Sequence, residues 1–270
     1  MLVPILMMVS MTVAAQKNDL ESLSDEFDKA ESINNWTSFH ESEDWPNHEL
    51  AVSINTDSKG SFHLEPNTGF WYGEVHCGPY YFKEVEGDFT VTTKVKASGR
   101  NTNVPEKLFS LAGLMVRSPR PEGVAKTEKG HENWLFLSTG YAKGKNRAQF
   151  ETKLTIKGKS KLKILLAPEG WVEIAITRER DQFTLCVKKN GKWEVLRTLT
   201  HPNMQEKLQV GMIAYTDFNA KMKRRYVFSR SSLNTTVFTD GEPDLIARFD
   251  YIRFFRNESQ VLFSHGEVSE

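Results

Sequence analysis

Apolar and polar residues alternate along most of this chain with a period of two rather than 3.6. Between residues 88 and 96, Phe89, Val91 and Val95 fall on one face of an extended segment, while threonines and lysines fall on the other. Because successive side chains of a β-strand point to opposite faces, this alternation predicts half-buried strands. The sequence has no long amphipathic helical pattern, so we expect an all-β protein.

Residues 171–199 give the clearest local prediction. Asn190-Gly191 separates two alternating runs, and both positions of such a turn need a positive φ, which Asn and Gly accept readily. With a polar turn at 179–182, the segment is predicted to form a three-stranded meander. Further strands are predicted at 50–54, 61–64, 80–84, 111–117, 133–138, 150–156, 208–215 and 249–256. Loops are predicted at 98–107, 118–133 and 157–161, with a long partly basic connection at 217–247.

The charges of the chain sum to zero, with 35 Lys and Arg against 35 Asp and Glu. A neutral chain argues against sequence-independent binding of nucleic acid, which needs a basic excess. Residues 16–90 carry sixteen acids and four bases, and residues 120–163 carry eleven bases and four acids. Such runs usually form solvated faces. The alternative is that the second run, with the lysines of 157–163, is a surface for an anionic glycan.

The N-terminus predicts export. Residues 1–15 carry no charge and end in Ala14-Ala15, which is typical of a signal peptide cleaved before Gln16; the alternative is a buried first strand. The mature chain, 16–270, is then expected to be one secreted, periplasmic or cell-surface domain. No segment offers the roughly 20 apolar residues of a membrane-spanning helix. Cys77 and Cys186 are too few for a disulfide-dense scaffold or a four-cysteine zinc site, but they could form one disulfide.

Short motifs bracket the predicted mature chain. Ser24-Asp-Glu-Phe-Asp28 and Phe249-Asp-Tyr-Ile-Arg-Phe-Phe255 resemble the terminal elements of laminarinase-type β-glucanases, which are concanavalin A-like sandwiches. Between them, Ala112-Gly-Leu-Met-Val-Arg117, Asn133-Trp134 and Val210-Gly211 are similar to uncharacterised secreted domains related to the C-terminal sandwich of β-xylosidases. The resemblance implies a jelly-roll β-sandwich of two antiparallel sheets and a poly- or oligosaccharide partner.

The catalytic pattern of those glucanases has no counterpart in this sequence. They carry two glutamates and an aspartate in a pattern close to E-x-D-x-x-E, whereas Glu84-Val-Glu86-Gly-Asp88 ends in a predicted turn. The chain is therefore predicted to be a carbohydrate-binding or carbohydrate-associated domain without evident catalytic residues. One alternative is a glycoside hydrolase or polysaccharide lyase with a non-standard site that uses Glu74, His76 or Asp217. The other is a structural or protein-interaction module.

Aromatic side chains carry the prediction of a ligand site. Sugar rings present apolar C–H faces, which flat aromatic rings with nearby polar groups suit well. The resemblance implies that such residues surround one concave sheet. The candidate ligand-binding residues are Trp71, Tyr72, His76, Arg117, Trp134, Tyr141 and Tyr215.

One metal site is also predicted. Asp250 matches an aspartate that, in the resembling glucanases and carbohydrate-binding modules, helps to hold a structural calcium ion. Calcium takes hard oxygen ligands from carboxylates and backbone carbonyls, which Glu26 and the carbonyl near Gly87 would supply. The alternative is that Asp250 caps a turn or pairs with Arg253.

Overall fold

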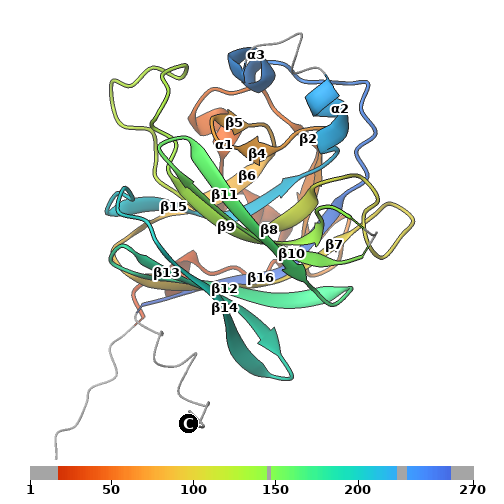
Figure 1. The fold of residues 1–270 in the computed structure, drawn as a ribbon. Coiled ribbons are helices and arrows are strands. Elements are labelled where there is room, and N and C mark those ends of the chain that lie inside the picture. Colours follow the sequence, from red (N-terminus) through yellow and green to blue (C-terminus); the bar gives the residue numbers. More distant parts are fainter. Residues whose placement is uncertain (1–17, 145–146, 224–229, 257–270) are drawn as a thin grey trace, which may run out of the picture.

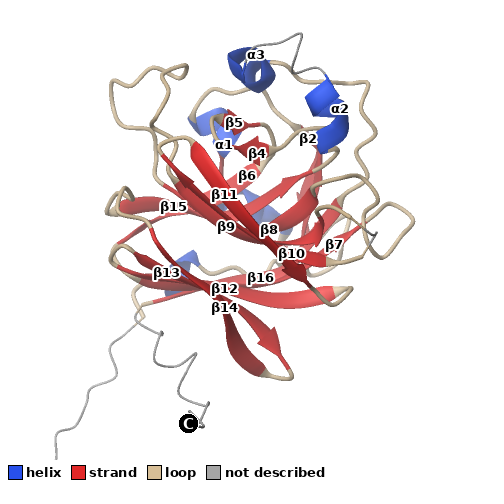
Figure 2. Cartoon of the chain, viewed as in Figure 1, coloured by secondary structure: helices blue, strands red, loops and turns tan. Residues whose placement is uncertain are grey.

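The computed structural model describes residues 18–144, 147–223 and 230–256. The predicted signal peptide and part of the basic run in 217–247 lie outside these residues. Strands dominate the described part, and the few helices are short (Figure 2). No helix in this part of the chain is both long and apolar enough to cross a membrane.

Two seven-stranded antiparallel sheets face one another (Figure 1). Sheet I runs in the order β1 (Thr37–Ser38), β6 (Tyr80–Glu86), β15 (Lys207–Tyr215), β8 (Ser110–Arg117), β9 (Trp134–Tyr141), β10 (Gln149–Ile156) and β11 (Lys159–Leu166). Sheet II runs in the order β14 (Lys192–Thr200), β13 (Gln182–Lys189), β12 (Trp171–Glu179), β7 (Phe89–Ser98), β16 (Ile246–Phe255), β3 (Phe62–Pro66) and β2 (Glu49–Ile54). This arrangement confirms the predicted all-β, jelly-roll type of sandwich.

The predicted meander is confirmed as β12, β13 and β14. Asn190 and Gly191 form the turn with φ values of 50° and 79°, as the hairpin requires. The other predicted strands all have counterparts. One expected loop is wrong, because only Lys157-Gly158 turns the chain and β11 starts at Lys159. Its lysines alternate with partly buried residues, so the polar composition concealed an edge strand.

The main core lies between the two sheets. Alternate residues of facing strands point inward and form one buried cluster, which the hydrophobic effect stabilises in proportion to the apolar area removed from water. Sheet I contributes Leu114, Leu137, Val210 and Met212, and sheet II contributes Val91, Ile174, Leu185 and Phe249.

A second core covers the outer face of sheet I. The hairpin β4 (Trp71–Tyr72) to β5 (Val75–His76), α1 (Phe39–Ser42), α2 (Phe218–Lys223) and α3 (Arg230–Thr235) lie above this face (Figure 1). Two 3₁₀ helices, Glu21–Leu23 and Ala30–Asn35, precede β1. Every residue of β8 and β9 is buried, because both faces of these strands are covered. This double burial accounts for their nearly continuous apolar sequence.

The two cysteines do not form the disulfide that the sequence allowed. Both are thiols, and Cys77 lies in the second core while Cys186 lies on β13. Burial raises the pKa of the Cys186 thiol to about 12, so this thiol stays protonated at neutral pH.

Candidate functional site

The β4–β5 hairpin crosses the outer face of sheet I and docks on its edge strand, β11. The hydroxyl of Tyr72 donates to the carbonyl of Ser160 at 3.3 Å, and the amide of Gly73 donates to Ser160 Oγ at 2.8 Å. Gly73 has a φ of 62°, and a Cβ atom there would lie 2.9 Å from the carbonyl oxygen of Gly158. The hairpin turn therefore rests against the β10–β11 turn, and it closes that side of the sheet.

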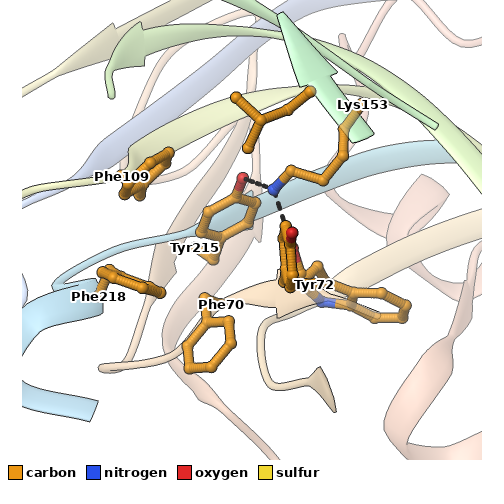
Figure 3. Close-up of a pocket in the computed structure, with 8 residues that line it drawn as sticks. Phe70, Tyr72, Phe109, Lys153, Tyr215 and Phe218 are labelled. Atoms are coloured by element: carbon orange, nitrogen blue, oxygen red, sulfur yellow. Dashed lines mark hydrogen bonds between the residues drawn. The ribbon is translucent and has the colours of Figure 1, made fainter. Parts of the chain in front are cut away.

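A pocket of about 270 Å³ lies beside this hairpin (Figure 3). Side chains from the hairpin, from sheet I and from three connections converge on it. Its lining consists of Phe70, Trp71, Tyr72, Phe109, Lys153, Leu162, Tyr215 and Phe218. We call it the aromatic pocket.

Three phenylalanines form one wall of the aromatic pocket. The Phe218 ring lies 5.0 Å from Phe70 and 5.1 Å from Phe109, and both contacts are edge-to-face. The Phe218 amide donates to the carbonyl of Leu108 at 3.1 Å, which fixes the start of α2 beside Phe109. Phe109 has a φ of 54°, a conformation that is costly for a bulky residue and is often found at functional sites.

One buried ammonium group lies at the centre of the aromatic pocket. Lys153 Nζ donates to the carbonyl of Trp71 at 2.9 Å and to the Tyr215 hydroxyl at 3.0 Å (Figure 3). It also lies 2.9 Å from Glu151 Oε1. The Tyr215 hydroxyl in turn donates to Glu151 Oε1 at 3.3 Å. The ammonium also lies 4.6 Å from the centre of the Phe136 ring, within the range of a cation–π contact.

Burial sets the protonation of this group of residues. It lowers the pKa of Lys153, against the opposing effect of the Glu151 charge, and it raises the pKa of Tyr215 well above its usual value. The second carboxylate oxygen of Glu151 and the Ser138 hydroxyl have no hydrogen-bond partner among the described residues. Glu151 and Ser138 are register partners on β10 and β9, so these two unpartnered groups lie on neighbouring strands.

Three of the predicted ligand-binding residues line the aromatic pocket. Tyr72 is 46% exposed and lies at the rim, Trp71 is buried beneath it, and Tyr215 lies on the floor. The sequence analysis missed Lys153, Phe109, Leu162 and Phe218. An acid and a base at alternate positions, Glu151 and Lys153, look like a solvated strand face, so sequence carried no signal for Lys153.

Three other predicted residues lie on the same face of sheet I, in what we call the Arg117 cluster. Arg117 donates to Glu132 at 3.1 and 3.0 Å and to Gln209 at 2.7 Å, and both of its terminal nitrogens bond Glu43. Arg120 bridges the same two carboxylates. Burial alone would raise the pKa of Glu132, but the positive charge of Arg117 holds it at about 2.

His76 and Trp134 fill the rest of the Arg117 cluster. The His76 ring lies 4.4 Å from Trp45 and 5.5 Å from Phe39, and burial lowers its pKa to about 4. Trp134 stacks on Phe136 at 5.6 Å and is fully buried. These rings therefore present no face to a ligand in this conformation.

Tyr141 lies apart from both groups. It packs with Val104 and Ala148, and its hydroxyl donates to the carbonyl of Gly144 at 2.9 Å.

The predicted calcium ligands engage protein groups. Asp250 accepts from Lys94 at 2.9 Å, and Glu26 accepts two hydrogen bonds from Arg253 at 2.6 and 2.7 Å. Both carboxylates line one surface depression of sheet II, whereas Gly87 is not part of its lining. Within residues 18–144, 147–223 and 230–256, no three His, Cys, Asp or Glu side chains form a metal-binding group. Calcium binding stays a prediction.

Two acids considered for catalysis have structural partners. Glu74 Oε1 accepts from the amide of Gly130 at 2.9 Å. Asp217 Oδ2 accepts from Thr68 at 3.2 Å and from the amide of Glu242 at 2.8 Å. A retaining glycoside hydrolase needs two carboxyl groups about 5–5.5 Å apart, and the lining of the aromatic pocket contains a single ionisable cation and no carboxylate.

Comparison with protein families identifies the chain. Residues 38–234 match the family described as "Protein of unknown function (DUF1349)". The chain belongs to the DUF1349 family. The match includes the hairpin, sheet I from Ser38 onward and all of α3 except Thr235, so every residue that lines the aromatic pocket is part of the DUF1349 region. No curated protein matches the chain.

Solved structures resemble this DUF1349 chain in fold. A functionally unknown protein from Saccharomyces cerevisiae is 19% identical with a TM-score of 0.55, and the match covers 82% of this chain and 96% of the yeast chain. Xylan β-1,4-xylosidase from Bacillus halodurans is 16% identical with a TM-score of 0.54, over 92% of this chain and 41% of the enzyme. A β-glucanase from Bacillus licheniformis is 10% identical with a TM-score of 0.50, over 90% of this chain and 100% of the enzyme. These likenesses confirm the concanavalin A-like sandwich fold that the terminal motifs indicated.

Proposed function

We propose that the protein is an exported carbohydrate-binding domain that holds the end of a glycan at the aromatic pocket. One observation carries the proposal: an unfilled pocket whose aromatic walls surround a buried ammonium on the covered face of a concanavalin A-like sheet. Sites of this kind combine apolar walls with a few fixed polar groups. The likeness to carbohydrate-active sandwiches and the sequence signal for export support the same role.

The shape of the site favours end-on binding. The hairpin and β11 are joined through Tyr72, Gly73 and Ser160, so a polysaccharide cannot continue across sheet I past this point. The volume of about 270 Å³ is at the lower end of ligand pockets, which span roughly 300–1,000 Å³. The pocket therefore has room for about one terminal group of the glycan, and the Tyr72 ring at the rim can stack on the adjoining sugar.

Titration calorimetry with defined glycans tests the proposal. Xylan, laminarin and mixed-linkage β-glucan, together with their hexasaccharides, form the panel for residues 16–270. The hexasaccharide that binds should lose roughly two- to thirteenfold in affinity in Tyr72→Ala, because a stacked aromatic ring contributes about 0.5–1.5 kcal/mol. Release of new reducing ends from any member of the panel would instead support the hydrolase alternative.

Trp171→Ala is the matched control. Trp171 is an aromatic residue on sheet II with 39% exposure, far in the fold from the aromatic pocket. Equal losses in Tyr72→Ala and Trp171→Ala, or loss of all binding on adding 0.5 M salt, would contradict the assignment to the pocket. The salt result would point instead to the exposed lysines of β11.

A further inference from the structure

The chemistry of the pocket walls narrows the ligand further. Resting on the proposed function, we infer that the group entering the aromatic pocket is an aromatic ring attached to a sugar, so that the ligand class is aryl-substituted glycans and aryl glycosides. The sugar then lies at the rim over Tyr72 and the ring lies inside. Three features of the aromatic pocket support this inference: its donors already bond protein groups, its volume fits a ring, and its walls are aromatic rings in edge-to-face contact.

The side-chain donors that line the pocket are already used within the protein. Lys153 Nζ donates to Trp71 O and Tyr215 Oη, and it forms an ion pair with Glu151 Oε1 at 2.9 Å. The Tyr215 hydroxyl donates to Glu151, and the Tyr72 hydroxyl donates to Ser160.

The indole N–H of Trp71 completes this set, since it donates to the carbonyl of Gly78 at 3.1 Å. A bare sugar ring carries several hydroxyl groups that need both donors and acceptors. If these hydroxyl groups were buried among phenylalanine rings and donors that already bond protein groups, some of them would have no hydrogen-bond partner. Each such hydroxyl would make the free energy of binding less favourable. An aromatic ring makes no such demand.

The volume and geometry of the pocket suit a ring. An apolar cavity of about 150 Å³ is enough for benzene, so about 270 Å³ leaves room for a substituted ring and its linkage. Phe218 already makes edge-to-face contacts with Phe70 and Phe109, and an incoming ring would extend this arrangement. The nearby Lys153 ammonium adds attraction for the negative face of a π system.

Matched glycosides test the inference on the whole mature chain. Phenyl, cyclohexyl and methyl β-glycosides of xylose and glucose share their sugar and differ only in the group that would enter the pocket. Calorimetry should give phenyl glycosides at least tenfold higher affinity than methyl glycosides, with cyclohexyl glycosides between them. Equal affinity of phenyl and methyl glycosides overturns the inference, and equal affinity of phenyl and cyclohexyl glycosides overturns its aromatic part.

Two variants locate the effect. Leu162→Trp fills the pocket from β11 and should reduce the phenyl-to-methyl affinity ratio to near one, and Phe218→Leu should reduce it at least threefold. Trp171→Leu, on sheet II, should leave the ratio unchanged. Circular dichroism of each variant establishes folding, and an unchanged ratio in folded Leu162→Trp overturns the inference.

The two proposals fail in different ways. If hexasaccharides of the panel bind and phenyl glycosides do not, the carbohydrate function stands and the aromatic ligand is wrong. If free phenol binds as tightly as phenyl glycosides, the ring pocket stands and the carbohydrate function is wrong. Failure of every probe contradicts both.

Discussion

The aromatic pocket and the Arg117 cluster occupy the same face of the same sheet, yet one is open and the other is filled. Both bury charge, and both balance it: Lys153 against Glu151 in the pocket, and two arginines against two glutamates in the cluster. The space left among the side chains differs, with about 270 Å³ in the pocket and about 40 Å³ beside His76 in the cluster. Buried charge alone therefore does not separate the two regions; the space left among the aromatic side chains does.

The largest expected loss of stability comes from a substitution that disrupts the Arg117 cluster. Arg117→Ala should destabilise the protein by about 3–5 kcal/mol, because it leaves two glutamates in a buried site with only Arg120 to compensate them. Urea unfolding followed by tryptophan fluorescence measures the change. A loss below about 1 kcal/mol would mean that the cluster is wet and loosely held.

Acid should weaken the Arg117 cluster in two stages. The pKa of His76 is about 4 in the folded protein and 6.5 for the free side chain. Its contribution to the free energy of unfolding is therefore complete above pH 6.5 and is lost as the pH falls towards 4. The contribution of Glu132 to the free energy of unfolding is complete above pH 4.5 and is lost as the pH falls towards 2. Each stage is worth up to about 3 kcal/mol.

Unfolding free energies at pH 7.5, 5 and 3 measure these stages. His76→Phe should remove the stage between pH 6.5 and 4 and leave the lower one. If the wild-type protein and His76→Phe lose stability equally over the upper range, another group titrates there.

A smaller effect tests how the aromatic pocket is closed. Gly158→Ala places a methyl group against the Glu74 carboxylate at a φ of 71°, so it should cost about 2–3 kcal/mol and weaken glycan binding. Gly170→Ala has a φ of 87° and no atom within 4 Å, so it should cost only about 1 kcal/mol. Thermal unfolding compares the two. Equal losses would show that the hairpin turn does not depend on this contact.

The smallest expected effect is that of the control residue. Trp171→Ala should change the unfolding free energy by less than about 0.5–1 kcal/mol, because the ring is partly exposed and its cation–π contact with Lys94 lies at the surface. Chemical unfolding under the same conditions as for Arg117→Ala makes the comparison direct. A loss comparable to that of Arg117→Ala would show that sheet II depends on this ring.

The sequence predicted sheet II better than the outer side of sheet I, for a physical reason. In β12 and β13 the apolar residues that face the main core alternate along the sequence with mostly polar ones, so period two reveals these strands and their turn at Asn190-Gly191, even though Thr177 and Arg178 on the alternate positions are also buried. β8 and β9 are buried on both faces, so their side chains could be assigned to a core but not to one side of the sheet.

The pocket residues illustrate what sequence could not supply. Trp71, Tyr72 and Tyr215 were predicted because aromatic residues suit sugar binding. Trp134 was predicted for the same reason, but it is fully buried and packs in the core. Phe109 and Phe218 meet across more than a hundred residues of chain, and Lys153 reaches a backbone carbonyl on the hairpin. These contacts depend on how the connections fold over the sheet, and the alternation of apolar and polar residues along the sequence does not predict them.

The strands and the connections supply different parts of the aromatic pocket, which has a consequence for how the pocket can change. The floor of the pocket, Lys153 and Tyr215, belongs to strands that hold the sandwich together, whereas Phe70, Phe109 and Phe218 belong to the segments that join or flank strands. Connections accept substitution and insertion more readily than the elements they link. Substitutions at these three positions can therefore reshape the walls of the pocket more readily than they disturb the strands that carry Lys153 and Tyr215.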